Sequence, residues 1–220
     1  MECRYLLAAA YAAVTALFIT GCSHDKMRPP AIDFTPQNGP VVPRSMNQMT
    51  REVGIRVSYM PKSTYARRHA ASMHPRFITI HSTANSSGTA ESHSRYLNSG
   101  KSRSIDWHFT VDQFGAYQHI PTTETGHHAD HSGPGDQFSV AIEMCECRQH
   151  NPVVIYNKTA KLTALLMKRY NVPLRNVVPH NYWSGKNCPA PLMTGGRPGY
   201  KWSWFISRVD YYSRCLQTEA

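Results

Sequence analysis

Acidic side chains are scarce in this sequence. Its 220 residues include 24 Lys and Arg but only 14 Asp and Glu, which gives a formal net charge of +10 with histidine neutral. Such a balance favours anionic partners, among them nucleic acids, acidic lipids and cell-wall polymers. The sequence lacks, however, any run of Lys and Arg interleaved with aromatic residues, because Arg67-Arg68 and residues 101–103 are short and scattered. We therefore expect no nucleic-acid binding.

Long apolar runs are also absent beyond the N-terminus, and no internal repeat is visible. The stretch from Tyr5 to Ile19 has the length of a secretory signal's apolar region rather than of a membrane span. The small pair Thr20-Gly21 and then Cys22 follow it, an order that resembles the lipobox of bacterial lipoproteins, whose cysteine is lipidated. The alternatives are an uncleaved anchor helix or an ordinary signal with an unrelated cysteine.

Export is expected in each of these cases, so the folded part should lie outside the cytoplasm. Ser23 after the cysteine resembles the pattern that directs lipoproteins to the outer membrane of cells with two membranes. Residues 23–50 are rich in Pro, Asn, Ser and Met without a helical or strand period, and we predict a flexible tether there. Residues 51–220 are long enough for one domain with its own core, which we expect to be monomeric.

Strand and helix patterns alternate along this region. That alternation, with one hairpin, predicts an α/β domain with a central mixed β-sheet flanked by helices. The expected strands are Phe77–Ile80, ending at His81, residues 139–147, and a hairpin of residues 105–111 and 116–120 around a glycine turn. The expected helices are residues 89–97, Lys158–Tyr170 and a closing helix that contains residues 202–212.

The segment between Pro179 and Pro189 concentrates reactive side chains. It contains His180, Lys186 and Cys188 within one short loop. Zinc prefers nitrogen and sulfur ligands in a tetrahedron, and a catalytic zinc keeps one position for water. His81, at the end of a core strand, is the candidate third ligand, because open sheets place their chemistry at strand ends.

Two alternatives compete with this ligand set. Residues 127–131 contain three histidines, but adjacent loop histidines point in different directions, so we interpret them as a pocket wall. The second alternative is a disulfide between Cys188 and Cys215. Cys145 and Cys147 are too close in sequence, on an expected strand, to bridge each other, whereas a bridge from one of them to Cys215 stays open.

Six ordered motifs carry a family resemblance. The series resembles the zinc-dependent N-acetylmuramoyl-L-alanine amidases of the amidase-2 family, which includes phage endolysins, bacillar cell-wall amidases and peptidoglycan recognition proteins. The match runs from about Arg76 to Pro189, over half of the chain. The motifs are residues 78–83, 106–112, 118–121, 126–129, 139–143 and 180–189.

The resemblance implies roles for individual residues. His81, His180 and Cys188 correspond to zinc ligands, Glu143 to the general base, and Lys186 to the lysine that steadies the oxyanion.

The resemblance also assigns two residues to the substrate-binding pocket, and two further positions depart from the family's motifs. Trp107 stands where related phage enzymes have a catalytic tyrosine, so the resemblance assigns that role to Glu143 and leaves Trp107 lining the pocket. His128 corresponds to a pocket histidine near the substrate. Phe138 replaces a usual small polar residue and Ala141 a usual glycine, which affects packing beside Glu143.

The implied reaction is hydrolysis of the amide between N-acetylmuramic acid and L-alanine in peptidoglycan. The competing function is a non-catalytic peptidoglycan-binding module, whose members typically lack the cysteine that Cys188 supplies. A structural alternative for Glu143 is an ion pair with Arg148 or Arg175.

Overall fold

The computed structural model describes residues 32–36, 39–102 and 104–216 of the chain. The predicted leader, with Cys22, lies outside these residues, and so do residues 23–31 and 37–38 of the predicted tether. Within the described ranges, no helix combines the length and the apolar character needed to cross a membrane.

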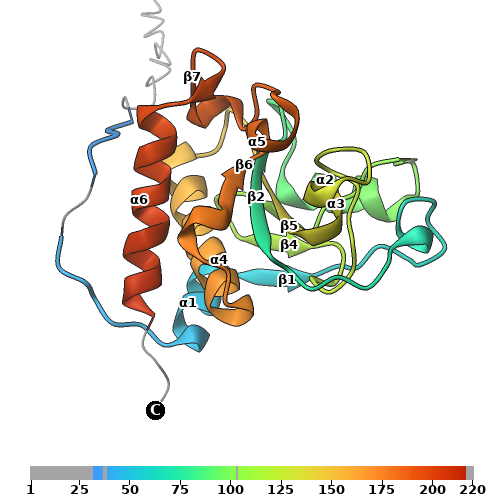
Figure 1. Ribbon diagram of the computed structural model, residues 1–220, viewed down its shortest axis with the longest axis horizontal. Coiled ribbons are helices and arrows are strands. Elements are labelled where there is room, and N and C mark those ends of the chain that lie inside the picture. Colours follow the sequence, from blue (N-terminus) through green and yellow to red (C-terminus); the bar gives the residue numbers. More distant parts are fainter. Residues whose placement is uncertain (1–31, 37–38, 103, 217–220) are drawn as a thin grey trace, which may run out of the picture. The chain divides into compact units, whose positions relative to one another are not determined.

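A six-stranded mixed sheet forms the centre of the domain (Figure 1). Its strand order is β1-β4-β3-β5-β2-β6, and β3 and β4 are antiparallel while the other neighbours are parallel. This confirms the predicted α/β fold with a mixed sheet. The strands are β1 (Ile55–Val57), β2 (Phe77–Ser82), β3 (Phe109–Val111), β4 (Ala116–Gln118), β5 (Ser139–Met144) and β6 (Val177–Pro179).

Helices cover both faces of the sheet. Figure 1 shows α1, α4 and α6 gathered on one side, with α2 and α3 on the other. These helices are α1 (Met46–Val53), α2 (Ala90–Asn98), α3 (Pro134–Phe138), α4 (Pro152–Tyr170) and α6 (Tyr200–Cys215). Shorter elements complete the fold: helix α5 (Asn181–Ser184), the hairpin of β7 (Met193–Thr194) and β8 (Arg197–Pro198), and 3-10 turns at Arg67–His69, Leu174–Asn176 and Ala190–Leu192.

The alternation of side chains along β2 decides which face carries the chemistry. Ile78 and Ile80 are fully buried in the main core, together with residues of α4 and α6. Because successive strand residues point to opposite faces, His81 lies on the other face. Its partner in the parallel register of β5 is Glu143, so the two predicted site residues lie side by side on the face that α2 and α3 flank.

Most predicted elements are present, with shifted ends. Helix α2 begins after Thr89, whose side chain caps it. Helix α4 begins at Pro152, six residues before the predicted start at Lys158, because the Asn151 side chain accepts a hydrogen bond from the Val153 amide and proline is tolerated in the first turn. Strand β5 ends at Met144, so the two cysteines predicted on it lie beyond its end.

The ordered domain also begins earlier than residue 51. Helix α1 occupies residues 46–53, and its side chains Met49 and Val53 are fully buried in the main core. Ile32 and Phe34 pack against the same core. Ile32, Phe34 and residues 46–50 of α1 lie within the predicted tether of residues 23–50, because their few apolar side chains stand in a polar sequence and leave no clear local pattern.

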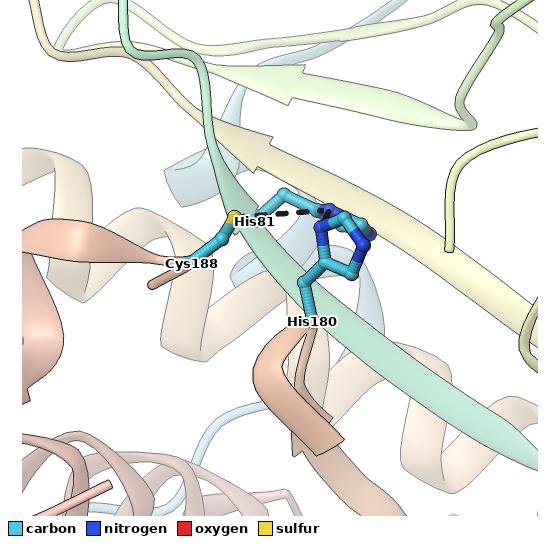
Figure 2. Close-up of side chains that lie close together, drawn as sticks. All are labelled: His81, His180 and Cys188. Atoms are coloured by element: carbon cyan, nitrogen blue, oxygen red, sulfur yellow. Dashed lines mark hydrogen bonds between the residues drawn. The ribbon is translucent and has the colours of Figure 1, made fainter. Parts of the chain in front are cut away.

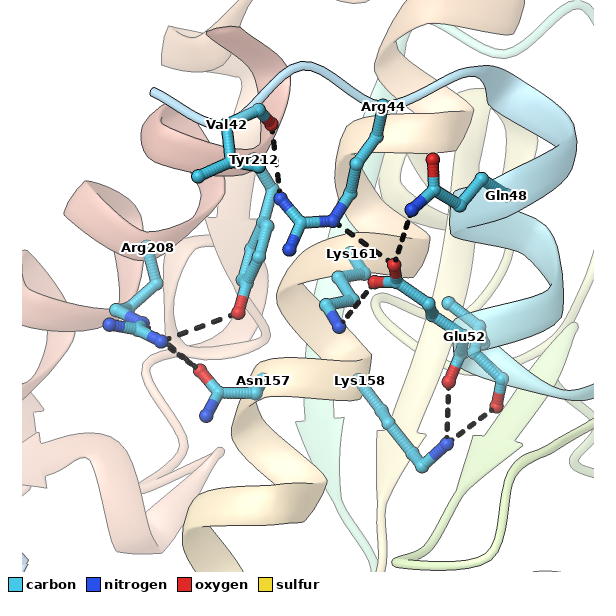
Figure 3. A network of polar contacts seen from close by, with 10 residues as sticks. Val42, Arg44, Gln48, Glu52, Asn157, Lys158, Lys161, Arg208 and Tyr212 are labelled. Carbon is cyan, nitrogen blue, oxygen red and sulfur yellow. Dashed lines mark hydrogen bonds and ion pairs between the residues drawn. The ribbon is translucent and has the colours of Figure 1, made fainter. Parts of the chain in front are cut away.

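An ion network holds α1 against α4 (Figure 3). The Glu52 carboxylate lies 3.1 Å from Arg44 Nε and 2.6 Å from Lys161 Nζ. Lys158 Nζ donates to the carbonyl oxygens of Glu52 and Val53, at 2.7 and 3.1 Å. These carbonyls lie at the C-terminal end of α1, where a cation is favourable. The network therefore holds α1 on the face of the sheet that lies away from the predicted site.

Candidate metal centre

Three neighbouring strand ends position the predicted site. The sheet order places β2 between β5 and β6, and these strands carry Glu143, His81 and, one residue past β6, His180. The His180 amide donates to the carbonyl of Ile80 at 3.0 Å, which extends the β2–β6 pairing to His180. Parallel strands end at the same edge of a sheet, so His81 and His180, which are 99 positions apart in the sequence, meet there.

Cys188 returns to this edge through a short clamped loop. After α5, Gly185 adopts a left-handed conformation with φ of 72°, which favours glycine. The Asn181 amide donates to the Cys188 carbonyl at 2.9 Å, and the Asn181 side chain donates to the Lys186 carbonyl at 2.8 Å. Asn181 was not predicted as a site residue, although it directly follows His180.

The three predicted metal ligands converge. Figure 2 shows the side chains of His81, His180 and Cys188 pointing toward one another. Nδ1 of His81 lies 3.1 Å from Nδ1 of His180 and 4.0 Å from the Cys188 sulfur. One ligand atom from each residue lies within 4.8 Å of the others, and among the described residues this is the one group of His, Cys, Asp and Glu that fits a metal ion.

The chemistry of this cluster favours a cation. Burial lowers the pKa of His81 well below its ordinary value, and the neighbouring His128 and His180 lower it further. Burial also lowers the pKa of His180. His180 Nε2 lies 2.9 Å from the carbonyl oxygen of Ala129. That oxygen only accepts, so Nε2 carries the proton and the Nδ1 lone pair of the neutral ring faces His81. Two neutral imidazoles and a cysteine sulfur form a typical metal-binding set.

Glu143 is a carboxyl group without a partner beside this cluster. Among the described residues its Oε2 atom is buried without a hydrogen bond, and neither Arg148 nor Arg175 forms an ion pair with it. Burial, then the charge of Glu146, raises the pKa of Glu143 to about 8. A buried carboxyl group held at so high a pKa inside a pocket is a candidate acid or base rather than a structural group.

The ligands and Glu143 line one pocket of about 330 Å³. Lys186 is exposed, belongs to this pocket, and also lines an adjoining pocket of about 260 Å³ bordered by residues 127–132. The walls of the larger pocket are His81, Ser82, Ala84, Ile105, Trp107, His127, His128, Glu143, His180, Lys186, Asn187, Cys188 and Ala190. All the predicted site residues therefore face the same space.

Trp107 and His128 form part of the wall in different ways. Trp107 is 7% exposed, packs in a second apolar cluster with Leu97 and Ala141, and donates from its indole to Thr110 at 2.6 Å. His128 contacts the metal cluster directly, since its Nδ1 lies 3.1 Å from His81 Nε2. The other histidines of residues 127–131 are not in the group that fits a metal ion.

Two aspartates that were not predicted as site residues hold the loop of these histidines through hydrogen bonds to backbone amides. Asp136 Oδ1 accepts from the amides of His128 and Ala129 at 2.8 and 2.7 Å. Asp130 accepts from the amides of Gly135 and Asp136 at 2.8 and 3.0 Å. Their only sequence signal is the turn composition of residues 132–136, which does not reveal which amides they bind.

Among the described cysteines, no disulfide removes Cys188 from the predicted ligand set. Within the described residues, Cys145, Cys147, Cys188 and Cys215 are all free. The Cys188–Cys215 disulfide considered above is therefore absent from the described structure. The positions that depart from the family pattern affect packing: the Phe138 ring lies 5.5 Å from the Arg76 guanidinium, and Ala141 is fully buried.

Comparison with known proteins adds independent information. The family model described as N-acetylmuramoyl-L-alanine amidase matches residues 71–191, more than half of the chain. The N-acetylmuramoyl-L-alanine amidase XlyA of Bacillus subtilis (strain 168) is 42% identical over 129 residues, covering 57% of this chain and 43% of that protein. CwlH of the same organism is 38% identical over 162 residues, covering 72% of this chain and 62% of CwlH.

Solved structures show the same relationship. The catalytic domain of XlyA superposes with a TM-score of 0.66 at 37% identity, covering 71% of this chain and 99% of that domain. The structure of PlyL gives a TM-score of 0.62 at 30% identity, covering 70% and 96%. The chain spans less than two thirds of the length of XlyA and CwlH.

Proposed function

The chain belongs to the amidase-2 family of N-acetylmuramoyl-L-alanine amidases, and from this premise we propose that it is a zinc-dependent peptidoglycan hydrolase. Its substrate bond is the amide between the lactyl group of N-acetylmuramic acid and L-alanine of the stem peptide. The observation that carries the proposal is a complete donor set, His81, His180 and Cys188, in one pocket with the unpartnered Glu143.

The donor set fits zinc in kind and in spacing. Tetrahedral zinc with Zn–N of about 2.1 Å and Zn–S of about 2.3 Å separates two nitrogens by about 3.4 Å and a nitrogen from a sulfur by about 3.6 Å. The corresponding separations in the protein are 3.1 and 4.0 Å, so small side-chain movements suffice. Three protein ligands with one open position are typical of a catalytic rather than a structural zinc site.

The residues around the donors supply the remaining chemistry. When bound, zinc supplies the Lewis acidity that makes water reactive near neutral pH. A cation among the ligands favours ionised Glu143, which can take a proton from the attacking water and pass it to the leaving nitrogen. The exposed ammonium of Lys186, at the rim of the pocket, stabilises the negative charge that develops on the carbonyl oxygen. Trp107 forms an apolar wall that limits access of bulk water.

The binding-module alternative is less favoured by this geometry. A module that only recognises peptidoglycan needs the pocket wall but neither the third ligand nor a buried carboxyl group beside it. Leaving Glu143 buried without a partner is costly for the fold. Such a cost is expected where the group has a chemical task.

Location is proposed from the sequence. The chain is exported and anchored in a membrane through lipidated Cys22, on the periplasmic side of the outer membrane where the cell has two membranes. The leader pattern and the small residues before Cys22 support this. Mass spectrometry of the N-terminal peptide tests it: a diacylglyceryl modification on Cys22 is expected, and an unmodified cysteine preceded by its leader would contradict it.

The enzymatic proposal is tested with the full chain purified in mild detergent. Incubation with peptidoglycan should release stem peptides that begin with a free L-alanine amine and leave muramic acid with a free carboxylate. Mass analysis of the products identifies both new ends. A chelator should stop the release and added zinc should restore it, whereas a zinc-loaded protein that releases no stem peptide would overturn the proposal.

A further inference from the structure

His128 uses both of its ring nitrogens within the protein. Its Nδ1 lies 3.1 Å from His81 Nε2, and its Nε2 lies 3.3 Å from the carbonyl oxygen of Ser139. The rings of His128 and His81 meet edge to face, with centroids 5.1 Å apart and an interplanar angle of 87°. A neutral imidazole has one donor and one acceptor, so none is left for a substrate while these bonds persist.

The carbonyl of Ser139 sets the direction of the hydrogen bonds. A carbonyl oxygen only accepts, so His128 Nε2 donates to it and His128 Nδ1 becomes the acceptor. His81 must then donate from its own Nε2, which leaves the lone pair of His81 on Nδ1. That atom is the one that faces His180 and Cys188.

We propose that His128 is a positioning residue of the metal centre, which holds His81 in the Nε2-protonated tautomer through the Ser139–His128–His81 hydrogen bonds and so directs the Nδ1 lone pair to the metal. Metal-bound histidines commonly donate their second ring nitrogen to such a partner, which fixes both tautomer and ring orientation. The inference rests on the zinc site proposed above, and it gives His128 a role different from the substrate contact that the sequence resemblance implies.

One carboxylate oxygen aligns the partners of both histidine ligands. Asp136 Oδ1 accepts from the amide of His128, which contacts His81, and from the amide of Ala129, whose carbonyl binds His180. The other acceptor, the Ser139 carbonyl, belongs to the first residue of β5, and this residue is fully buried. The carbonyls of Ser139 and Ala129 therefore orient the rings of His128 and His180, and His128 in turn orients His81.

Zinc affinity of the full chain tests the proposal. We expect His128→Leu, which removes both hydrogen bonds, to raise the zinc dissociation constant about 10–100-fold. His128→Gln offers one acceptor and one donor on its carboxamide and should restore most of the affinity. His127→Leu is the matched control: it changes the adjacent histidine, whose side chain makes no hydrogen bond with the described residues, and zinc affinity should stay unchanged.

Kinetics and spectroscopy separate this role from its alternatives. If His128→Leu binds zinc as tightly as the unchanged chain and only raises KM, His128 contacts substrate and the proposal is overturned. Nitrogen-15 spectra of the metal-free chain provide a readout that needs neither zinc nor activity. They should show His81 protonated on Nε2, and protonation on Nδ1 overturns the proposal even if the leucine variant does not fold.

Failure of the proposed zinc site can be distinguished from failure of the proposed role of His128. An unchanged chain that binds no zinc contradicts the hydrolase proposal, whereas the tautomer of His81 in that same metal-free chain still decides whether His128 orients it.

Discussion

Two glutamates on opposite sides of the sheet have opposite pKa shifts, one lowered by ion pairs and one raised by burial. Burial alone would raise the pKa of Glu52, but its hydrogen bonds to Lys161 and Arg44 outweigh that effect and lower it. Burial, then the charge of Glu146, raises the pKa of Glu143 to about 8, and among the described residues no ion pair includes this carboxyl group. Glu52 joins α1 to α4, whereas Glu143 lies in one pocket with the donor set of His81, His180 and Cys188. The paired carboxylate stabilises the contact between α1 and α4, and the proposed function makes the unpaired carboxyl group the general base.

The largest expected difference between the two glutamates is in turnover. Glu143→Gln removes the proposed base while conserving size, and kcat should fall about 10²–10⁴-fold because general-base catalysis contributes that much. Zinc content should remain unchanged. Glu52→Gln is the matched control, with kcat close to that of the unchanged chain. Steady-state release of stem peptides measures both, and an active Glu143→Gln variant would assign the base to another residue.

Two lysines extend the comparison with a smaller expected effect. Lys186→Met removes the ammonium at the pocket rim and should lower kcat about 10²-fold, which is typical for loss of one group that stabilises an oxyanion. Lys161→Met removes a cation from the Glu52 network and should change stability but not kcat. Equal losses of kcat in the two variants would show that Lys186 acts through the fold rather than on the substrate.

The sequence predicted the site better than its surroundings. His81, His180 and Cys188 were predicted together because zinc requires particular ligand types, and such types are visible in a sequence. Asp136 and the carbonyl of Ala129 were not predicted, because their role depends on which amides and rings a folded loop brings near them.

The same reasoning explains the errors in the fold. The β-branched strand at 77–80 and the helix capped by Thr89 have strong local signals, and both are present. Residues 46–50 of α1 were assigned to the tether, because the stability of this helix comes from burial of Met49 and Val53 against distant helices and from the contacts of Glu52. Contacts across long sequence separations leave little local pattern.

The two glutamates should also differ in their effect on stability: replacing Glu143 should stabilise the fold, whereas replacing Glu52 should destabilise it. In the metal-free chain, Glu143→Gln should raise the free energy of unfolding at pH 7, on the order of 1–3 kcal/mol. The reason is that the unfolded chain ionises Glu143 freely at this pH, whereas burial in the folded chain disfavours the ionised carboxylate, and glutamine carries no charge in either state. The pKa of Glu143 in the folded chain, about 8, is above the ordinary glutamate value of 4.5. The unchanged chain therefore loses stability relative to the variant as pH rises from 4.5 toward 8. Urea unfolding with chelator at several pH values measures this, and a constant difference would contradict it.

Glu52 should show the smallest effect and the opposite dependence on pH. Its side chain is 27% exposed, so solvent screens its ion pairs, and Glu52→Gln should cost about 1 kcal/mol at pH 7. Because the folded pKa of Glu52 is lowered, its stabilisation is present above the unfolded pKa and disappears as pH falls through the folded value. The unfolding curves of the unchanged chain and Glu52→Gln should therefore converge in acid. A penalty that persists below both pKa values would show that the Glu52 side chain stabilises α1 through packing and neutral hydrogen bonds rather than through its charge.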